Sequence, residues 1–78
     1  IYPNPVEDEL SVAFTLNNAQ SSRLQIQDVS GKITQEHVVH ANAGSNMVFI
    51  DTKTLAQGMY FLTIQTGETE QTVQFVVK

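Results

Sequence analysis

The sequence predicts an all-β protein, a small antiparallel β-sandwich of about six to seven strands. Several short stretches alternate apolar and polar residues, and this period of two places one set of side chains on one face of a sheet. Turn-forming residues recur about every 8–12 residues between these stretches, which is typical of an antiparallel sandwich or a small barrel. No apolar pattern with a helical period is long enough to predict a stable helix.

The first part of the chain predicts an extended segment followed by one amphipathic strand. Pro3 and Pro5 fix their own φ angles and favour extended backbone in the residues before them. After a short acidic run, apolar residues alternate with small or polar ones, which is the clearest half-buried strand in the chain. Its apolar positions are Leu10, Val12, Phe14 and Leu16. The polar residues 17–22 then predict a connection.

A hairpin is predicted next. Leu24 and Ile26 alternate with glutamines, and Asp28–Lys32 has the composition of a turn. The second arm of the hairpin should extend from about Ile33 to Val39. Residues 41–45 predict a further loop because they combine Asn, Gly and Ser.

Residues 47–50 are apolar at every position, so the period of two does not decide which of them face inward. An inward-facing Val48 would leave both of its neighbours exposed, Met47 and Phe49. Phe61 would be exposed in the same way on its own strand. Such an apolar patch on a soluble domain marks a partner site. Alternatively, these side chains lie under a loop or between the sheets.

The segment before Phe61 predicts a tyrosine corner, in which a Tyr at the start of a strand folds over the preceding loop and bonds backbone just upstream. Leu55, Gly58 and Tyr60 have the spacing of this motif, and Gly58 suits the turn because glycine tolerates a positive φ. Alternatively, Tyr60 is only a core aromatic. The last strand follows, and its predicted inner side comprises Val73, Phe75 and Val77.

The composition argues against several classes of protein. The chain has 78 residues, which suits one domain near the lower size limit for a self-sufficient core. It contains no Cys, so neither a disulfide nor a thiolate metal site can stabilise it. A net charge of −4 with four basic residues argues against a nucleic-acid partner. No apolar run approaches the ~20 residues needed to span a bilayer, so we expect no membrane span, and we expect a monomer.

Motifs for catalysis and for cofactor binding are missing from the sequence. His37 and His40 are at positions i and i+3 of one predicted strand, so they should point to opposite faces and not bind one metal ion together. The acidic run Glu7–Glu9 lacks the alternating oxygen ligands and the Gly of a calcium loop. The four glycines stand alone at separate turns, so none forms a phosphate-binding loop. We therefore expect a protein that is not an enzyme and that needs no cofactor or metal.

Four landmarks follow one another along the chain. They are Tyr2-Pro3-Asn4-Pro5, then Asp28-Val29-Ser30-Gly31-Lys32, then Ile50-Asp51 with Leu55-Ala56-Gln57-Gly58-Met59-Tyr60, and a short last strand ending in Lys78. Together, in this order and spacing, they resemble the C-terminal sorting domain of the type IX (Por) secretion system of Bacteroidetes, type A. The resemblance covers the whole chain.

The resemblance implies an immunoglobulin-like fold and a cleavable, non-catalytic signal at the C-terminus of a longer secreted protein. Residues 1–78 would be this single domain. Its cargo would pass through the periplasm and across the outer membrane to the cell surface or the medium. The implied partners are the type IX translocon and a surface sortase, which removes the domain and attaches the cargo to lipopolysaccharide.

The resemblance also implies the family's motif positions, of which most should shape the fold and some should take part in recognition by the translocon. They are Tyr2, Pro3, Asn4, Pro5, Gly31, Lys32, Gly58, Tyr60, Val73, Phe75, Val76, Val77 and Lys78. We expect the last strand to be an edge strand and the critical part of the signal, because an edge offers backbone groups to a receptor. The family often has a basic residue within this strand, whereas here only Lys78 at its end is basic. This departure speaks against recognition of charge in the last strand.

Two other functions compete with the sorting signal. An accessory carbohydrate-binding sandwich of a secreted enzyme would need an exposed aromatic platform or a polar cleft, and the chain contains no Trp. An inert spacer of the fibronectin type would be followed by further domains in the parent protein. A stop codon directly after Lys78 in the parent gene would favour the sorting signal.

Overall fold

A computed structural model describes residues 8–67 and 69–78, and these residues form six strands and no helix. The strands are β1 (Glu9–Leu16), β2 (Gln20–Asp28), β3 (Ile33–Ala41), β4 (Gly44–Asp51), β5 (Gly58–Thr66) and β6 (Thr69–Val77). Each predicted strand after the extended segment is present. The extended segment itself, with Pro3 and Pro5, lies outside the described residues.

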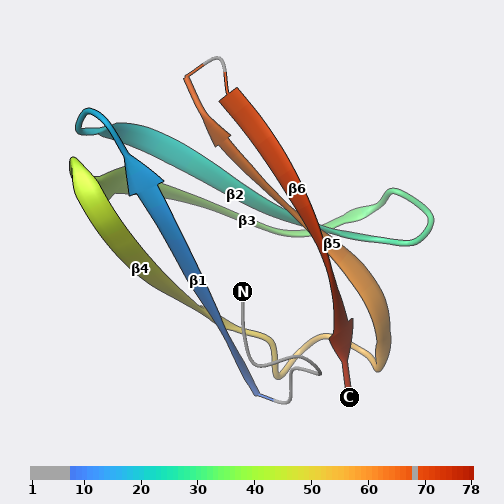
Figure 1. The fold of residues 1–78 in the computed structure, drawn as a ribbon. Helices are drawn as coiled ribbons and strands as arrows, with labels where there is room; N and C mark the ends of the chain where they lie inside the picture. The colour runs from blue at the N-terminus through green and yellow to red at the C-terminus, as the bar shows by residue number, and fades with distance from the viewer. Residues whose placement is uncertain (1–7, 68) are drawn as a thin grey trace.

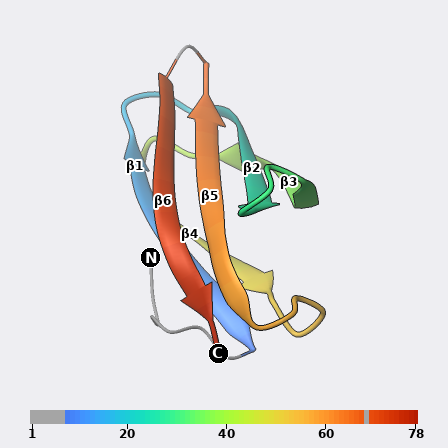
Figure 2. The same ribbon diagram turned by 90° about the vertical axis from the view of Figure 1, so that its right-hand side faces the viewer.

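The strands form two antiparallel sheets that pack face to face. One sheet pairs β1 with β4, and the other has the strand order β3-β2-β5-β6. Figure 1 shows β1 and β4 side by side in one layer, and Figure 2 shows β5 beside β6 in the other. The prediction of an all-β antiparallel sandwich is confirmed. The four-stranded order corresponds to strands C′, C, F and G of immunoglobulin-type sandwiches.

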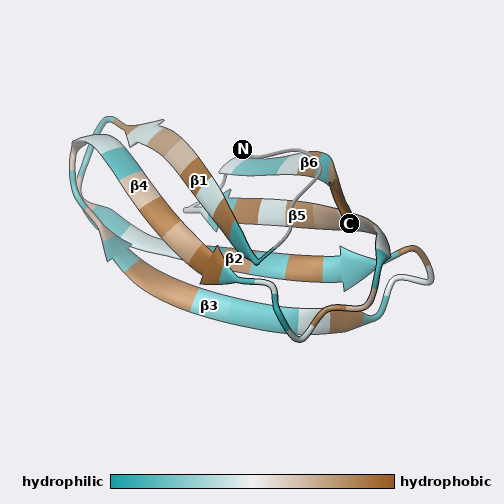
Figure 3. Ribbon diagram, turned by 90° about the horizontal axis from the view of Figure 1, so that it is seen from below, coloured by the Kyte–Doolittle hydropathy of each residue, from teal (hydrophilic) through white to brown (hydrophobic). Residues whose placement is uncertain are grey.

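The core lies between the two sheets and follows from the period of two along each strand. In Figure 3 brown and teal bands alternate along β2. The buried cluster comprises Leu10, Val12, Leu24, Ile26, Ile50, Tyr60, Leu62, Ile64, Phe75 and Val77. Because Ile50 belongs to this cluster and Val48 packs against it, Met47 and Phe49 face outward. This settles the orientation of β4, which the sequence left open.

The predicted polar connection over residues 17–22 is wrong in its second half. β2 already begins at Gln20, and Ser22 is buried against β5. Its side-chain oxygen lies 2.9 Å from that of Thr66, which is also buried. A polar residue can occupy an inner strand position when its hydroxyl has a partner there. The composition of this segment therefore suggested a loop where a hydrogen bond across the sheet permits a strand.

Replacing one member of this hydroxyl pair should cost more than replacing both. Ser22→Ala leaves the Thr66 hydroxyl without this partner in the core, and we expect a loss of about 1–3 kcal/mol in the free energy of unfolding. The double variant Ser22→Ala/Thr66→Val removes both polar groups and should be more stable than Ser22→Ala alone. Urea unfolding of the three proteins measures both values. A double variant that is no more stable than Ser22→Ala would contradict this expectation.

The loop predicted over residues 41–45 is shorter in the structure. β3 continues to Ala41, and β4 begins at Gly44. The Asn46 side chain closes this tight connection, because its Nδ2 donates to the carbonyl oxygens of Asn42 and Gly44 and its Oδ1 accepts from the Asn42 amide. Gly44 has a φ of +95°, which glycine adopts without steric cost.

A register shift in the β2–β3 pair reverses the face of Ile33. Ile26 pairs with Gln35, whereas the next residue, Gln27, pairs with Ile33. Thr34 is the extra residue of this irregularity, and its hydroxyl donates to the carbonyl oxygen of Ile26 at 3.1 Å. An extra residue in one strand reverses the faces of the side chains on one side of it relative to those on the other side. Ile33 therefore shares the outer face with Gln27, away from the core.

Candidate functional site

The turn between β2 and β3 is organised by the side chain of Asp28. One oxygen, Oδ1, accepts hydrogen bonds from the Ser30 hydroxyl and from the amides of Ser30 and Lys32. The Ser30 hydroxyl contributes most to lowering the pKa of Asp28, with the two amides and the Lys32 charge adding to it against some desolvation. Gly31 has a φ of +89°, where a side chain would be strained. This motif therefore shapes a turn, with Lys32 exposed at its end.

The predicted tyrosine corner is confirmed. The Tyr60 hydroxyl donates to the carbonyl oxygen of Ala56 at 2.7 Å, and the Tyr60 ring is buried at the start of β5. Gly58 has a φ of +151°, and Leu55 packs against the core. The hydrogen bond of the corner thus holds the loop after β4 against the start of β5.

We expect Tyr60→Phe to lower the free energy of unfolding by about 0.5–1.5 kcal/mol, because it removes one partly buried hydrogen bond and keeps the ring. Urea unfolding of the purified domain measures this loss. The matched control is Phe61→Tyr, which adds a hydroxyl on the half-exposed outer face of the same strand and should change stability by less than about 0.5 kcal/mol. Equal stability of Tyr60→Phe and the parent chain would contradict a stabilising corner.

The last strand alternates as predicted. Phe75 and Val77 are buried and Val73 is half-buried, while Val76 is exposed on the other face. Lys78 follows the strand and is exposed. β6 is the last strand of its sheet among the described strands, which confirms its predicted position in the fold.

Strand register brings the turn around Asp28, the tyrosine corner and the last strand to one end of the four-stranded sheet, whereas Ile50 and Asp51 of the third landmark lie in β4 of the other sheet. Asp28 of the turn pairs with Tyr60 of the corner, and Tyr60 pairs with Phe75 of β6. The rings of Tyr60 and Phe75 stack with their centroids 5.8 Å apart. Gly58 pairs with Val77 in the same way. The remaining landmark, Tyr2-Pro3-Asn4-Pro5, lies outside the described residues, and its role stays a prediction.

The outer face of the sheet at this end carries exposed apolar side chains, which we call the corner patch: Ile33, Met59, Phe61 and Val76. Ile33 and Phe61 flank Gln27, since both pair with it from opposite sides. Met59 pairs with Val76 and lies two residues before Phe61 on the same face of β5. Ile33, Met59 and Val76 are 47%, 40% and 39% exposed, and Phe61 is half-buried.

The exposed apolar side chains singled out by the sequence do not form one patch. Phe61 lies on the outer face of the four-stranded sheet, whereas Met47 and Phe49 lie on the outer face of the β1–β4 sheet. The period of two does indicate Met59 as an outward neighbour of Phe61. The period of two could not indicate that Ile33 belongs to the same outer face, because the register shift in the β2–β3 pair changes the face of Ile33.

The histidines and acidic residues in the part of the chain that the structure describes do not gather into a metal site. His37 pairs with Leu24 and its Nε2 lies 2.9 Å from Gln35 Oε1, while His40 pairs with Ser21, so the two rings are on opposite faces as predicted. No three His, Cys, Asp or Glu side chains of the described residues group to hold a metal ion. No helix formed by these residues could cross a membrane.

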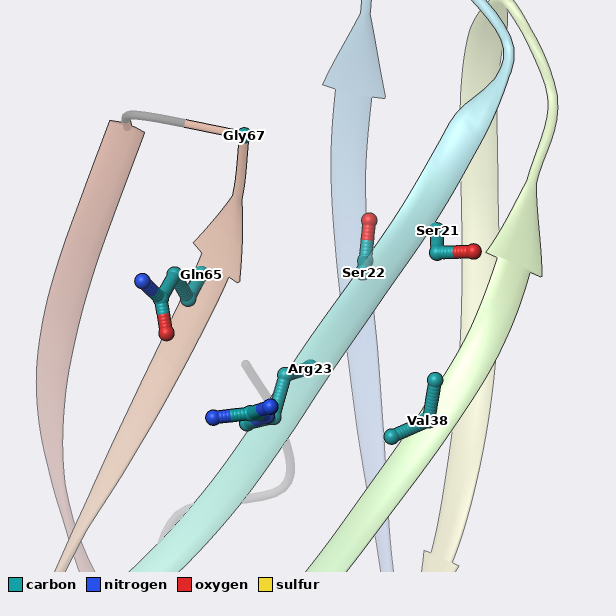
Figure 4. A pocket seen from close by; sticks show the side chains of 6 residues that line it. All are labelled: Ser21, Ser22, Arg23, Val38, Gln65 and Gly67. Carbon is teal, nitrogen blue, oxygen red and sulfur yellow. The ribbon is translucent and has the colours of Figure 1, made fainter.

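A hollow at the other end of the four-stranded sheet is lined mainly by polar side chains. Figure 4 shows its lining, in which Arg23 and Gln65 come from neighbouring strands. The lining residues are Ser21, Ser22, Arg23, Val38, Gln65 and Gly67. None of them is a base that could activate the Ser21 hydroxyl, which nucleophilic catalysis requires.

Comparison with known families identifies the chain over its full length. The sequence model of a family described as the secretion system C-terminal sorting domain matches residues 1–78. No curated protein matches the chain. Domains of this family are non-catalytic signals of type IX secretion, and the cargo that carries them is secreted or attached to the cell surface. The chain thus belongs to the family of C-terminal sorting domains that direct cargo proteins through the type IX secretion system.

Proposed function

We propose that the domain is a sorting domain of type A and that the corner patch is the surface it presents to the type IX translocon. The order and spacing of the four landmarks support the assignment to type A. The observation that supports the corner patch is the strand register, which gathers three motif segments at one end of one sheet. At each segment an exposed apolar side chain points outward: Ile33 beside the turn, Met59 in the corner and Val76 in β6. Apolar patches of this kind on soluble domains mark partner sites.

The motif residues divide into two groups by their position. Gly31, Gly58, Tyr60, Phe75 and Val77 shape turns or fill the core, so they would act by holding the patch in place. Val76, Lys32 and Lys78 are exposed at the same end of the sheet and would contact the partner directly. Val73 is half-buried on the inner side and would belong with the first group.

The family likeness supports the remaining steps of the pathway. We infer that residues 1–78 form the single C-terminal domain of a longer secreted protein, which enters the periplasm before it meets the translocon. A surface sortase then removes the domain and attaches the cargo to lipopolysaccharide. Mass spectrometry of surface-released cargo tests this step, because cleavage upstream of the domain leaves none of its peptides on the cargo.

A matched pair of variants tests the corner patch. In a fluorescent reporter fused upstream of the domain and expressed in a type IX-competent host, we expect Val76→Asp to reduce surface delivery about tenfold or more, since a charge placed in an apolar contact costs at least about 1.4 kcal/mol. Val38→Asp is the control, because Val38 is 65% exposed on the outer face of the same sheet, away from the patch. Surface fluorescence and periplasmic retention measure both.

Folding must be separated from recognition in this test. Both substitutions are at exposed positions, so each should change the free energy of unfolding by less than about 1 kcal/mol. Normal delivery of Val76→Asp, or an equal defect in Val38→Asp, would contradict a role for the corner patch. The family assignment would stand in either case, because the unmodified domain is the positive control for export.

A further inference from the structure

The free edge of β4 combines two features that edge strands usually avoid. In the part of the chain that the structure describes, β4 pairs with β1 alone, and Figure 1 shows it at the border of its layer. β4 contains no Pro, and its one charged residue is Asp51 at its last position, although charges and prolines are the common means of blocking an edge. By contrast, β3, which is the edge strand of the four-stranded sheet on the side of β4, has Glu36 near its middle.

Large apolar side chains lie beside this edge. Met47 is 45% and Phe49 is 62% exposed on the outer face. Their partners on β1 are small, since Ala13 pairs with Met47 and Ser11 pairs with Phe49, and small side chains cannot cover them. Behind the edge, Val48 lines a cleft of about 400 Å³ that opens between β4 and β3 and is also lined by Phe14 and Val39.

We propose that this edge binds the same edge of a second copy of the chain, with the two β4 strands antiparallel about a two-fold axis at Val48. In this register Met47 of each copy lies opposite Phe49 of the other, and directly opposed side chains in antiparallel strands are about 4.5–5.5 Å apart at Cβ. The two Met–Phe pairs form by symmetry, because the same patch serves on both sides of a two-fold interface. A continuous sheet β1-β4-β4-β1 results.

The second copy suits this edge better than a charged partner segment would. The pairing places thioether sulfur beside an aromatic ring, a favourable contact. In the same register Asp51, the one charged residue of β4, lies opposite the uncharged Ser45 of the other copy, so no like charges face each other directly. The contact involves one strand from each copy, so the buried area is small. Each copy carries a net charge of −4, so the two copies repel each other at low salt. We therefore expect a weak dimer that salt strengthens, in place of the monomer expected from the sequence.

Sedimentation velocity of the 78-residue chain tests the proposal. We expect a reversible dimer with a Kd between about 10 μM and 1 mM, and tighter association at about 0.5 M salt. Met47→Lys/Phe49→Lys places lysines opposite lysines in the proposed register, and Met47→Glu/Phe49→Glu does the same with carboxylates. Each should weaken self-association at least about tenfold. An equimolar mixture of the two variants should restore the dimer, since Lys then faces Glu.

The control is Val38→Lys/Gln74→Lys, which adds the same charge to exposed positions of the other sheet and should dimerise like the parent chain apart from the general effect of charge. A parent chain that stays monomeric at about 1 mM and high salt overturns the proposal. A lysine variant that dimerises as well as the control overturns it too. A mixture that stays monomeric contradicts the proposed register. None of these outcomes bears on export, which the reporter fusion measures separately.

Discussion

Phe75→Ala should destabilise the domain by about 3–5 kcal/mol, because it removes a fully buried aromatic side chain and leaves a cavity. Phe75 is 0% exposed, and its ring stacks on Tyr60 in the corner. A core as small as this one rarely supplies more than about 3–5 kcal/mol of net stability. We therefore expect the variant to be largely unfolded at 25 °C, as measured by circular dichroism and urea unfolding.

The neighbouring position provides the control. Gln74 is exposed on the outer face of β6, so Gln74→Ala should change the free energy of unfolding by less than about 0.5 kcal/mol. If Phe75→Ala lost less than about 1 kcal/mol, the packing described for β6 would be wrong. As an export signal, Phe75→Ala should fail together with its fold, whereas Val76→Asp should fail while folded.

Deletion of residues 73–78 should abolish surface delivery of the reporter and retain the cargo in the periplasm. The structure shows that this deletion does more than remove a recognition strand. It takes Phe75 and Val77 out of the core and leaves Tyr60 and Gly58 without their partners on β6. The loss should exceed that of Phe75→Ala, so the truncated domain should be unfolded and prone to proteolysis. Fractionation and immunoblotting of the fusion measure both effects.

A control for the deletion keeps β6 at full length. Thr72 is exposed, and its side-chain oxygen lies 3.1 Å from that of Thr63 on the outer face. Thr72→Ala should therefore leave delivery near that of the parent domain. Surface delivery of the truncated fusion at the parent level would refute a signal role for the last strand.

The sequence by itself determined the class of fold, the positions of most strands and the family. The alternation of apolar and polar residues along a segment such as Leu10–Leu16 depends only on the residues of that segment. It can therefore be recognised in the sequence without the rest of the fold. The same holds for the tyrosine corner, because Gly58 and Tyr60 are neighbours in the chain and the Tyr60 hydroxyl reaches back only to Ala56. The turn around Asp28 is local in the same sense.

Only the tertiary structure decided which segments meet and which faces they present. Ser22 belongs to a strand because Thr66, far away in the sequence, gives its hydroxyl a buried partner. Met47 and Phe49 face outward because Ile50 fits the core, which a uniformly apolar stretch cannot reveal.

The corner patch also depended on strand register. The extra residue at Thr34 turns Ile33 to the outer face, beside side chains of β5 and β6. Register and bulges follow from hydrogen bonds and packing between distant strands. The sequence could therefore identify the motifs of this sorting domain, whereas the surface they build together depended on how β2, β5 and β6 align.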